Sequence, residues 1–161
     1  MARFNLIPAA TLLGFATMSG AAAGQEGATK PDIAIPGECR LSQPATVAGS
    51  LKDVPDVAAE LKRQGIELAD TGERFQLYDV TVRGLPTRQF VRAYVFSDRT
   101  ILWYFHGGQA AHLHVVELRL VRNPTEAAPL LRLTGNTLTG PPCLATQAML
   151  DGVRGVGPGE W

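Results

Sequence analysis

Five short runs of β-branched and aromatic residues constrain this chain more than any other feature. The runs span residues 74–82, 88–97, 101–106, 112–122 and 130–134, with the potential for a last strand after residues 135–136. Such residues favour pleated, half-buried strands. The segments RGLPT, SDRT and GGQAA that separate the runs are of hairpin length, and strands joined so closely run antiparallel. The sequence therefore predicts an antiparallel meander of about five strands.

Two helices are expected at either end of this meander. The first spans residues 54–64, with Asp53 as its cap and Gly65 as its stop. Its apolar positions recur at helical spacing and form one stripe: Val54, Val57, Ala58 and Leu61. A shorter helix is expected over residues 144–150, ending at Gly152. The apolar stripe indicates that the first helix lies on the sheet.

Alternation of side chains along the strands predicts that both faces of the sheet are largely apolar. One face is predicted to carry Tyr78, Val80, Val82, Phe90, Arg92, Tyr94, Phe96, Ile101, Trp103, Phe105, Leu113 and Val115. The other is predicted to carry Val91, Ala93, Val95, Leu102, Tyr104, His106, His112, His114, Val116, Leu118 and Leu120. This assignment places Phe96 near Ile101 and His106 near His112. A sheet with two apolar faces needs a cover on each side or must close on itself. We therefore expect an α+β fold, with one helix packed on a curved meander and a short C-terminal helix; the alternative is a small β-barrel.

The chain divides into four parts by composition. Residues 1–23 place one arginine ahead of an apolar run and end in small residues, which is typical of a cleavable secretory signal. Residues 24–38 mix Gly, Pro and charge and are expected to be flexible, as is the tail at 153–161. Residues 39–152 are then predicted to form a single α+β domain, an ordinary size for one core.

Two cysteines, Cys39 and Cys143, lie near the two ends of the predicted domain. In an exported chain with an even cysteine count, a disulfide between them is the expected state. The alternative is a pair of buried free thiols. Together with the signal, the disulfide predicts a periplasmic or secreted protein.

Charge and motifs exclude several classes of function. The chain carries 15 basic and 15 acidic residues, so no nucleic-acid partner is expected. After residue 23 no apolar run approaches the ~20 residues that a membrane-spanning helix requires. Nucleophile elbows, CxxC pairs, phosphate-binding glycine loops and HExxH motifs are all missing from the sequence. No catalytic residue is therefore predicted.

All three histidines of the chain fall within the stretch HGGQAAHLH, as His106, His112 and His114. Residues two apart on a strand share a face, and a five-residue hairpin loop brings His106 beside His112. Three neutral imidazoles with an open fourth position suit zinc or copper. The alternative is that these are solvated polar positions at a strand end, because no carboxylate on that face is predicted to orient the rings.

A second candidate site surrounds Arg92, which is predicted to point toward aromatic side chains. These are Tyr78, Phe90, Tyr94 and Phe105, and Trp103 of the same face is also a candidate ligand-binding residue. An arginine in an aromatic concavity can hold an anionic ligand or stack on a ring. Alternatively, its stem crosses the core and its head pairs with Asp79 or Glu117 at the edge.

These features together predict an exported, non-enzymatic binding or accessory protein of the bacterial envelope. It would use the aromatic sheet face to bind an unidentified protein partner or a small apolar or anionic ligand, without a cofactor. The first alternative is a metal-binding protein that holds Zn or Cu through the three histidines. The second alternative is a purely structural envelope protein.

Overall fold

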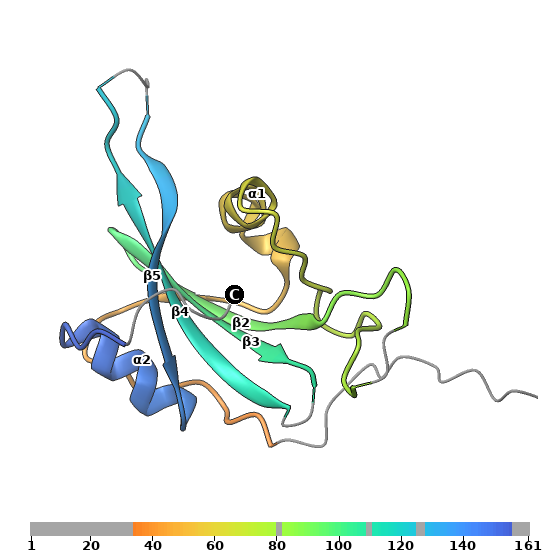
Figure 1. Cartoon of the computed structure of the whole chain (residues 1–161). Helices are drawn as coiled ribbons and strands as arrows, with labels where there is room; N and C mark the ends of the chain where they lie inside the picture. The colour runs from red at the N-terminus through yellow and green to blue at the C-terminus, as the bar shows by residue number, and fades with distance from the viewer. Residues whose placement is uncertain (1–33, 80–81, 109–110, 125–127, 156–161) are drawn as a thin grey trace, which may run out of the picture.

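The structure is a computed structural model that describes residues 34–79, 82–108, 111–124 and 128–155. In chain order its elements are β1 (Thr46–Ala48), the 3₁₀ helix η1 (Leu51–Asp53), α1 (Pro55–Arg63), β2 (Arg88–Val95), β3 (Arg99–His106), β4 (His112–Val121), β5 (Leu130–Thr139) and α2 (Pro142–Leu150). The strands form one antiparallel sheet in the order β1-β2-β3-β4-β5 (Figure 1). The predicted α+β meander is confirmed. The barrel alternative is wrong, because the sheet stays open between β1 and β5.

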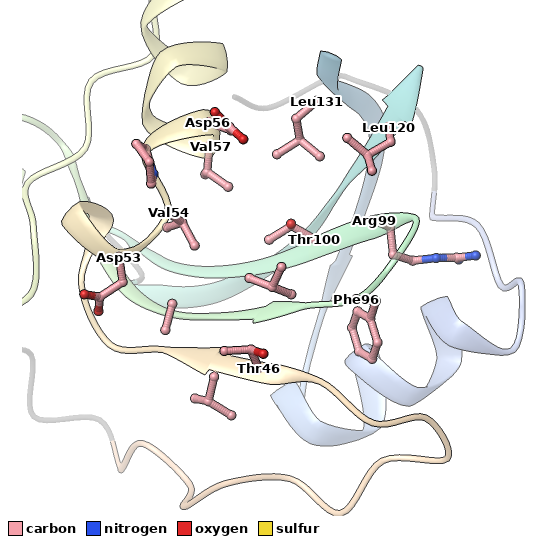
Figure 2. A pocket seen from close by; sticks show the side chains of 14 residues that line it. Thr46, Asp53, Val54, Asp56, Val57, Phe96, Arg99, Thr100, Leu120 and Leu131 are labelled. Atoms are coloured by element: carbon pink, nitrogen blue, oxygen red, sulfur yellow. The ribbon is translucent and has the colours of Figure 1, made fainter. Parts of the chain in front are cut away.

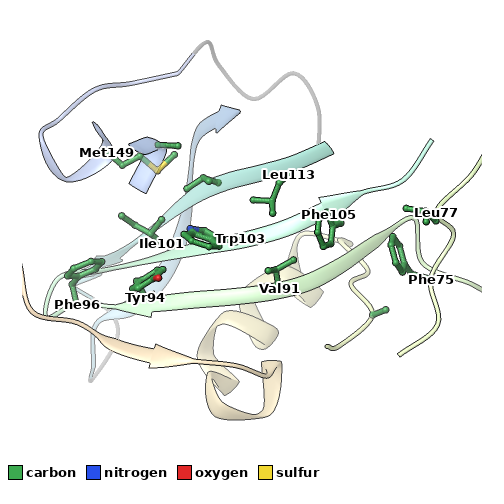
Figure 3. Packing of buried hydrophobic residues seen from close by; sticks show 13 residues of the cluster. Phe75, Leu77, Val91, Tyr94, Phe96, Ile101, Trp103, Phe105, Leu113 and Met149 are labelled. Atoms are coloured by element: carbon green, nitrogen blue, oxygen red, sulfur yellow. The ribbon is translucent and has the colours of Figure 1, made fainter. Parts of the chain in front are cut away.

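The two helices cover opposite faces of the sheet (Figure 1). α1 contributes Val57 and Leu61 to a core that includes Leu102, Tyr104 and Val116. On the other face, α2 contributes Ala145 and Met149 to a core built around the side chains shown in Figure 3, with Trp103 at its centre. Because each helix buries one apolar face of the sheet, both faces can be apolar without being exposed.

A β-bulge in β2 alters the predicted assignment of residues to faces. β2 pairs with β3 at Phe90↔Tyr104 and resumes at Arg92↔Trp103, so that Val91 is an extra residue. Phe90 therefore packs in the α1-side core and Val91 in the α2-side core, the reverse of the prediction. The extra residue shifts the alternation within the strand.

Five local features of the structure differ from the expectations. Residues 74–82 do not form a strand in their described part, and the segment is irregular around Phe75. β1 was not expected at all, and β5 continues through residues 135–136 as one strand. Ile101 pairs with Tyr94 rather than Phe96. Asp53 does not cap α1, because its carboxylate accepts a hydrogen bond from the Ser50 N–H within the capping box of η1.

The predicted disulfide is confirmed: Cys39 and Cys143 are bonded, which joins the N-terminal segment to the start of α2. The Cys39 N–H donates to the Tyr94 hydroxyl at 2.9 Å. On the same side, the Trp103 indole N–H donates to the Thr146 hydroxyl of α2 at 2.8 Å. The N-terminal segment, α2 and the sheet are thereby held together around the α2-side core.

A buried carboxylate joins α1 to β5. Glu60 accepts two hydrogen bonds from Arg63 at 2.7 Å each and one from the Leu133 N–H at 3.1 Å. Arg132 of β5 also forms an ion pair with it at 3.3 Å. Burial raises the pKa of Glu60, but the hydrogen bonds from Arg63, Leu133 and Gln64 outweigh burial and lower the pKa to about 2. Glu60 is therefore charged in the folded protein at neutral pH.

The predicted signal, residues 1–23, lies outside the described residues, as do most of the segment 24–38 and residues 156–161 of the tail. Residues 34–38 have no regular secondary structure. In the C-terminal tail, the carbonyl of Val153 and the N–H of Gly155 both bond to the Asn136 side chain on β5. Among the described helices, none is both long and apolar enough to cross a membrane.

Candidate metal centre

The register of β3 and β4 brings the three histidines together on the face of the sheet that α1 covers. His106 lies directly opposite His112, and Tyr104 lies directly opposite His114. His112 and His114 are two residues apart on β4, so their side chains share that face. Convergence of the three imidazoles therefore follows from strand pairing alone, as the sequence predicted.

The three rings are close enough to share one ion after a small adjustment. The centroids of His112 and His114 lie 4.3 Å apart, and that of His106 is 5.8 Å from His112 and 5.6 Å from His114. One nitrogen from each ring lies within 4.8 Å of the other two. In a tetrahedral site with Zn–N distances of about 2.0–2.1 Å, the ligand nitrogens lie roughly 3.4 Å apart. Side-chain movements of about 1 Å therefore bring all three nitrogens into coordination range.

His114 is the buried member of the cluster. Only 3% of it is exposed, and its ring stacks on Tyr104 with the centroids 5.0 Å apart and the planes 5° from parallel. Neither ring nitrogen has a hydrogen-bond partner among the described residues. A buried polar group without a partner costs on the order of 1–3 kcal/mol. His114 is therefore not one of the solvated polar positions that the sequence offered as an alternative.

The surroundings of His114 keep its imidazole neutral. Burial lowers the pKa of His114 to about 4, with smaller contributions from the positive charges of His112, His106 and Arg88. A neutral imidazole retains the lone pair that a metal ligand needs. His112 is the most exposed of the three histidines and His106 is intermediate, so the cluster runs from the protein interior to the surface.

The donor set of the cluster consists of imidazoles alone. No Asp, Glu or Cys joins the three histidines in the part of the chain that the structure describes. Three neutral nitrogen donors suit Zn²⁺ and Cu²⁺ better than the oxygen-preferring Mg²⁺ or Ca²⁺. With three protein ligands, a fourth coordination position remains for an exogenous ligand.

The loop that follows His106 is anchored by its backbone. The N–H of Gly107 donates to the carbonyl of Thr87 at 2.9 Å, and that of Gly108 donates to the carbonyl of Leu77 at 3.0 Å. A Cβ at Gly107 would collide with the carbonyl of Gln76. Glycine at 107 therefore permits the close approach that fixes the chain immediately after His106.

Arg88 is a residue of the site that the sequence reasoning missed. It pairs with His106 across β2 and β3, and its charge acts on His114. Its Nε atom is buried without a hydrogen-bond partner. No sequence signal places it there, because the pairing of Arg88 with His106 depends on the extra residue Val91 in β2.

The structure does not place the aromatic candidates on an exposed surface. Tyr94, Trp103 and Phe105 are at most 1% exposed and form the α2-side core (Figure 3). Tyr78 is 66% exposed and lies on the irregular segment, away from any strand.

Arg92 has structural contacts of its own. Its guanidinium donates to the carbonyl of Gly37 at 2.7 Å and to that of Pro36 at 3.1 Å. Its Cζ atom lies 5.3 Å from the centroid of the Trp103 ring. Neither Asp79 nor Glu117 pairs with it, and Glu117 instead binds Arg99 and Arg119. Arg92 therefore fastens the N-terminal segment to the sheet.

A separate cavity of about 370 Å³ opens between α1 and the sheet at the other end of the strands (Figure 2). Its walls include Val54, Val57 and Leu131, with Asp56 and Thr100 also lining it. Because Thr100 stands near the start of β3 and His106 at its end, this cavity is distinct from the histidine cluster. None of the predicted site residues lines it.

Compared with models of protein families, with curated proteins and with solved structures, the chain shows no significant match.

Proposed function

We propose that this is an exported metal-binding protein, and that it holds Zn²⁺ or Cu²⁺ through His106, His112 and His114. The observation that carries the proposal is the burial of His114, neither of whose ring nitrogens has a hydrogen-bond partner among the described residues. At a position used only for packing, an apolar ring would be more stable than a buried imidazole without a hydrogen-bond partner. A metal ion that accepts the lone pair of His114 accounts for an imidazole at this position beside two others.

The arrangement of the three rings suits capture of the ion from solution. His112, the most exposed of the three, can meet the ion first, and His114 then completes the site from the interior. The stack of His114 on Tyr104 restricts the orientation of the buried ring. Since no Asp, Glu or Cys joins the three imidazoles in the donor set among the described residues, we expect reversible binding, which is appropriate to an accessory protein that carries or buffers a metal.

The disulfide supports export, because bonds of this kind persist in the periplasm and outside the cell. The signal predicted over residues 1–23 is consistent with the same destination. We therefore place the protein in the periplasm or among secreted proteins of a bacterium. An envelope protein of purely structural role is the alternative that the metal titration below distinguishes.

The experiment is a titration of the metal-free, disulfide-bonded protein with Zn²⁺ and Cu²⁺ at pH 7.5 and pH 5.5, followed by calorimetry and by thermal unfolding. We expect one equivalent to bind at pH 7.5, to raise the unfolding temperature and to bind more weakly at pH 5.5, because protons compete for imidazole. The double variant His112→Ala/His114→Ala should lose this binding.

The matched control is Val121→Ala, at the exposed far end of the same strand β4. It should bind metal as the wild-type protein does. Metal binding that is equally strong in the double histidine variant, or that is missing from the wild-type protein, would contradict the proposal; the second result would favour the structural role.

A further inference from the structure

Arg88 stands beside the histidine cluster, and no acidic side chain of the described residues pairs with it. It forms no ion pair with a described residue, and its guanidinium donates a long hydrogen bond to the Thr87 hydroxyl, at 3.4 Å. Its Nε atom is buried without a partner. The other partly buried arginines near α1 and β4 are paired, since Arg132 binds Glu60 and Arg99 binds Glu117. Arg88 differs from both in having no carboxylate.

Arg88 lies on the same face of the sheet as the three histidines. Arg88 and His106 are directly opposed on neighbouring strands, so their side chains lie on the same face of the sheet. It is also close enough to His114 to act on that ring electrostatically. A positive charge in this place weakens the binding of a bare dication by repulsion. A site built only to hold the cation would not benefit from it.

A cavity of about 450 Å³ adjoins Arg88 on the α1 side of the sheet. The residues that line it with Arg88 are Gln64, Gly65, Ile66, Leu133, Thr134 and Gly135. None of these is acidic, so the described lining offers no negative charge to neutralise the guanidinium. No histidine of the cluster is among these residues, so Arg88 is the residue that the cavity and the cluster surroundings share.

We infer that the fourth position of the metal is filled by a small anion, and that Arg88 binds this anion through its buried Nε–H. The chemical class is a small inorganic anion or a carboxylate, with one atom on the metal and another accepting from the guanidinium. This inference rests on the proposed metal site. The anion reverses the sign of the electrostatic effect of Arg88, because it attracts both the metal and the guanidinium. Arg88 then favours an anion as the fourth ligand of the metal.

The test uses the full chain loaded with Cu²⁺ and titrated with azide, an anion whose binding to copper is followed by a charge-transfer absorption band. Arg88→Gln is compared with the wild-type protein and with Arg40→Gln, which removes the same charge from an exposed residue outside both the cluster and the cavity. We expect Arg88→Gln to weaken azide binding at least about tenfold, the typical effect of losing a charge-assisted hydrogen bond. The affinity for Cu²⁺ itself should be unchanged or higher in Arg88→Gln, and Arg40→Gln should behave as the wild type.

Two further results separate the failure of this inference from the failure of the metal site. If Cu²⁺ binds to both proteins and azide binds Arg88→Gln as tightly as the wild type, Arg88 does not hold the anion and the inference is overturned alone. If the wild-type protein binds no Cu²⁺, the metal site fails and the inference fails with it. A variant Arg88→Lys, which keeps the charge but removes the planar fork, should recover only part of the azide affinity.

Discussion

Replacing His114 by leucine in the metal-free protein should flatten the dependence of stability on pH between about pH 6.5 and pH 4. The pKa of His114 falls from 6.5 to about 4 on folding, first because of burial and then because of the positive charges of His112, His106 and Arg88. Above pH 6.5 the imidazole is neutral in both states and titration of His114 has no effect. As the pH falls below 6.5, His114 becomes protonated in the unfolded chain but stays neutral in the folded protein. The free energy of unfolding therefore decreases until the pH reaches the pKa of His114 in the folded protein.

The magnitude follows from the two pKa values. At about 1.4 kcal/mol for each pH unit, the difference between 6.5 and about 4 corresponds to roughly 3 kcal/mol of unfolding free energy. His114→Leu removes this loss. At pH 8 the variant should also be more stable than the wild type by about 1 kcal/mol, since it no longer buries two unpartnered nitrogens.

The assay is urea unfolding followed by tryptophan fluorescence at several pH values from 8 to 4, with a chelator present throughout. His112→Leu is the matched control, because His112 is exposed on the same strand and should leave most of the pH dependence in place. Equal pH dependence of the wild type and His114→Leu, together with a loss of stability in that variant at pH 8, would mean that His114 is an ordinary satisfied core residue.

Three further predictions concern the frame that holds the site. Replacing both Cys39 and Cys143 by alanine opens a loop with a sequence separation of 104 residues and should cost on the order of 4–5 kcal/mol of unfolding free energy; a loss below about 1 kcal/mol in urea unfolding would refute this. Glu60→Gln should cost roughly 3 kcal/mol at pH 7, because the Glu60 pKa is lowered from 4.5 to about 2. That difference should shrink as the pH falls from 4.5 toward 2, and a difference that is constant with pH would contradict it. Thr146→Val should cost about 1–3 kcal/mol by leaving the buried Trp103 indole N–H without its acceptor, and chemical denaturation that detects no change would argue against this bond.

Periodicity and loop length were sufficient to predict the meander, because hairpin connections leave little choice of neighbour. The pairing of His106 with His112 followed from the five residues between them, and β3 and β4 contain no irregularity against each other that would disturb it. The disulfide followed from cysteine count and compartment. Each of these predictions used only loop length, the spacing of apolar residues or the number of cysteines, all of which can be read from the sequence.

Features that depend on tertiary packing were not predictable in the same way. The bulge at Val91 depends on how β2 pairs with β3. The alternation of side chains along one strand does not predict an extra residue. β1 is only three residues long, too short to show a period. Aromatic residues suggested a binding face at Tyr94, Trp103 and Phe105. In the structure, α2 and the N-terminal segment that the disulfide joins to it cover these side chains.

The same limit applies to the candidate site. The sequence placed the histidines together but could not show that His114 is buried, which depends on the packing of α1 over the sheet and on the pairing of β5 beside β4. Arg88 was overlooked because its relation to the cluster is a cross-strand pairing that only the register reveals. The candidate site thus combines three histidines that lie close together in the sequence with Arg88, which only the fold brings to them.

The most direct test of the account is X-ray absorption spectroscopy at the metal edge of the wild-type protein loaded with one equivalent of Zn²⁺. We expect three histidine nitrogens at about 2.0–2.1 Å and one further light-atom ligand, and the imidazole scattering should be reduced in His114→Leu. A coordination shell of oxygen atoms with fewer than two imidazoles would contradict the central claim, because the ion would then be held somewhere other than His106, His112 and His114.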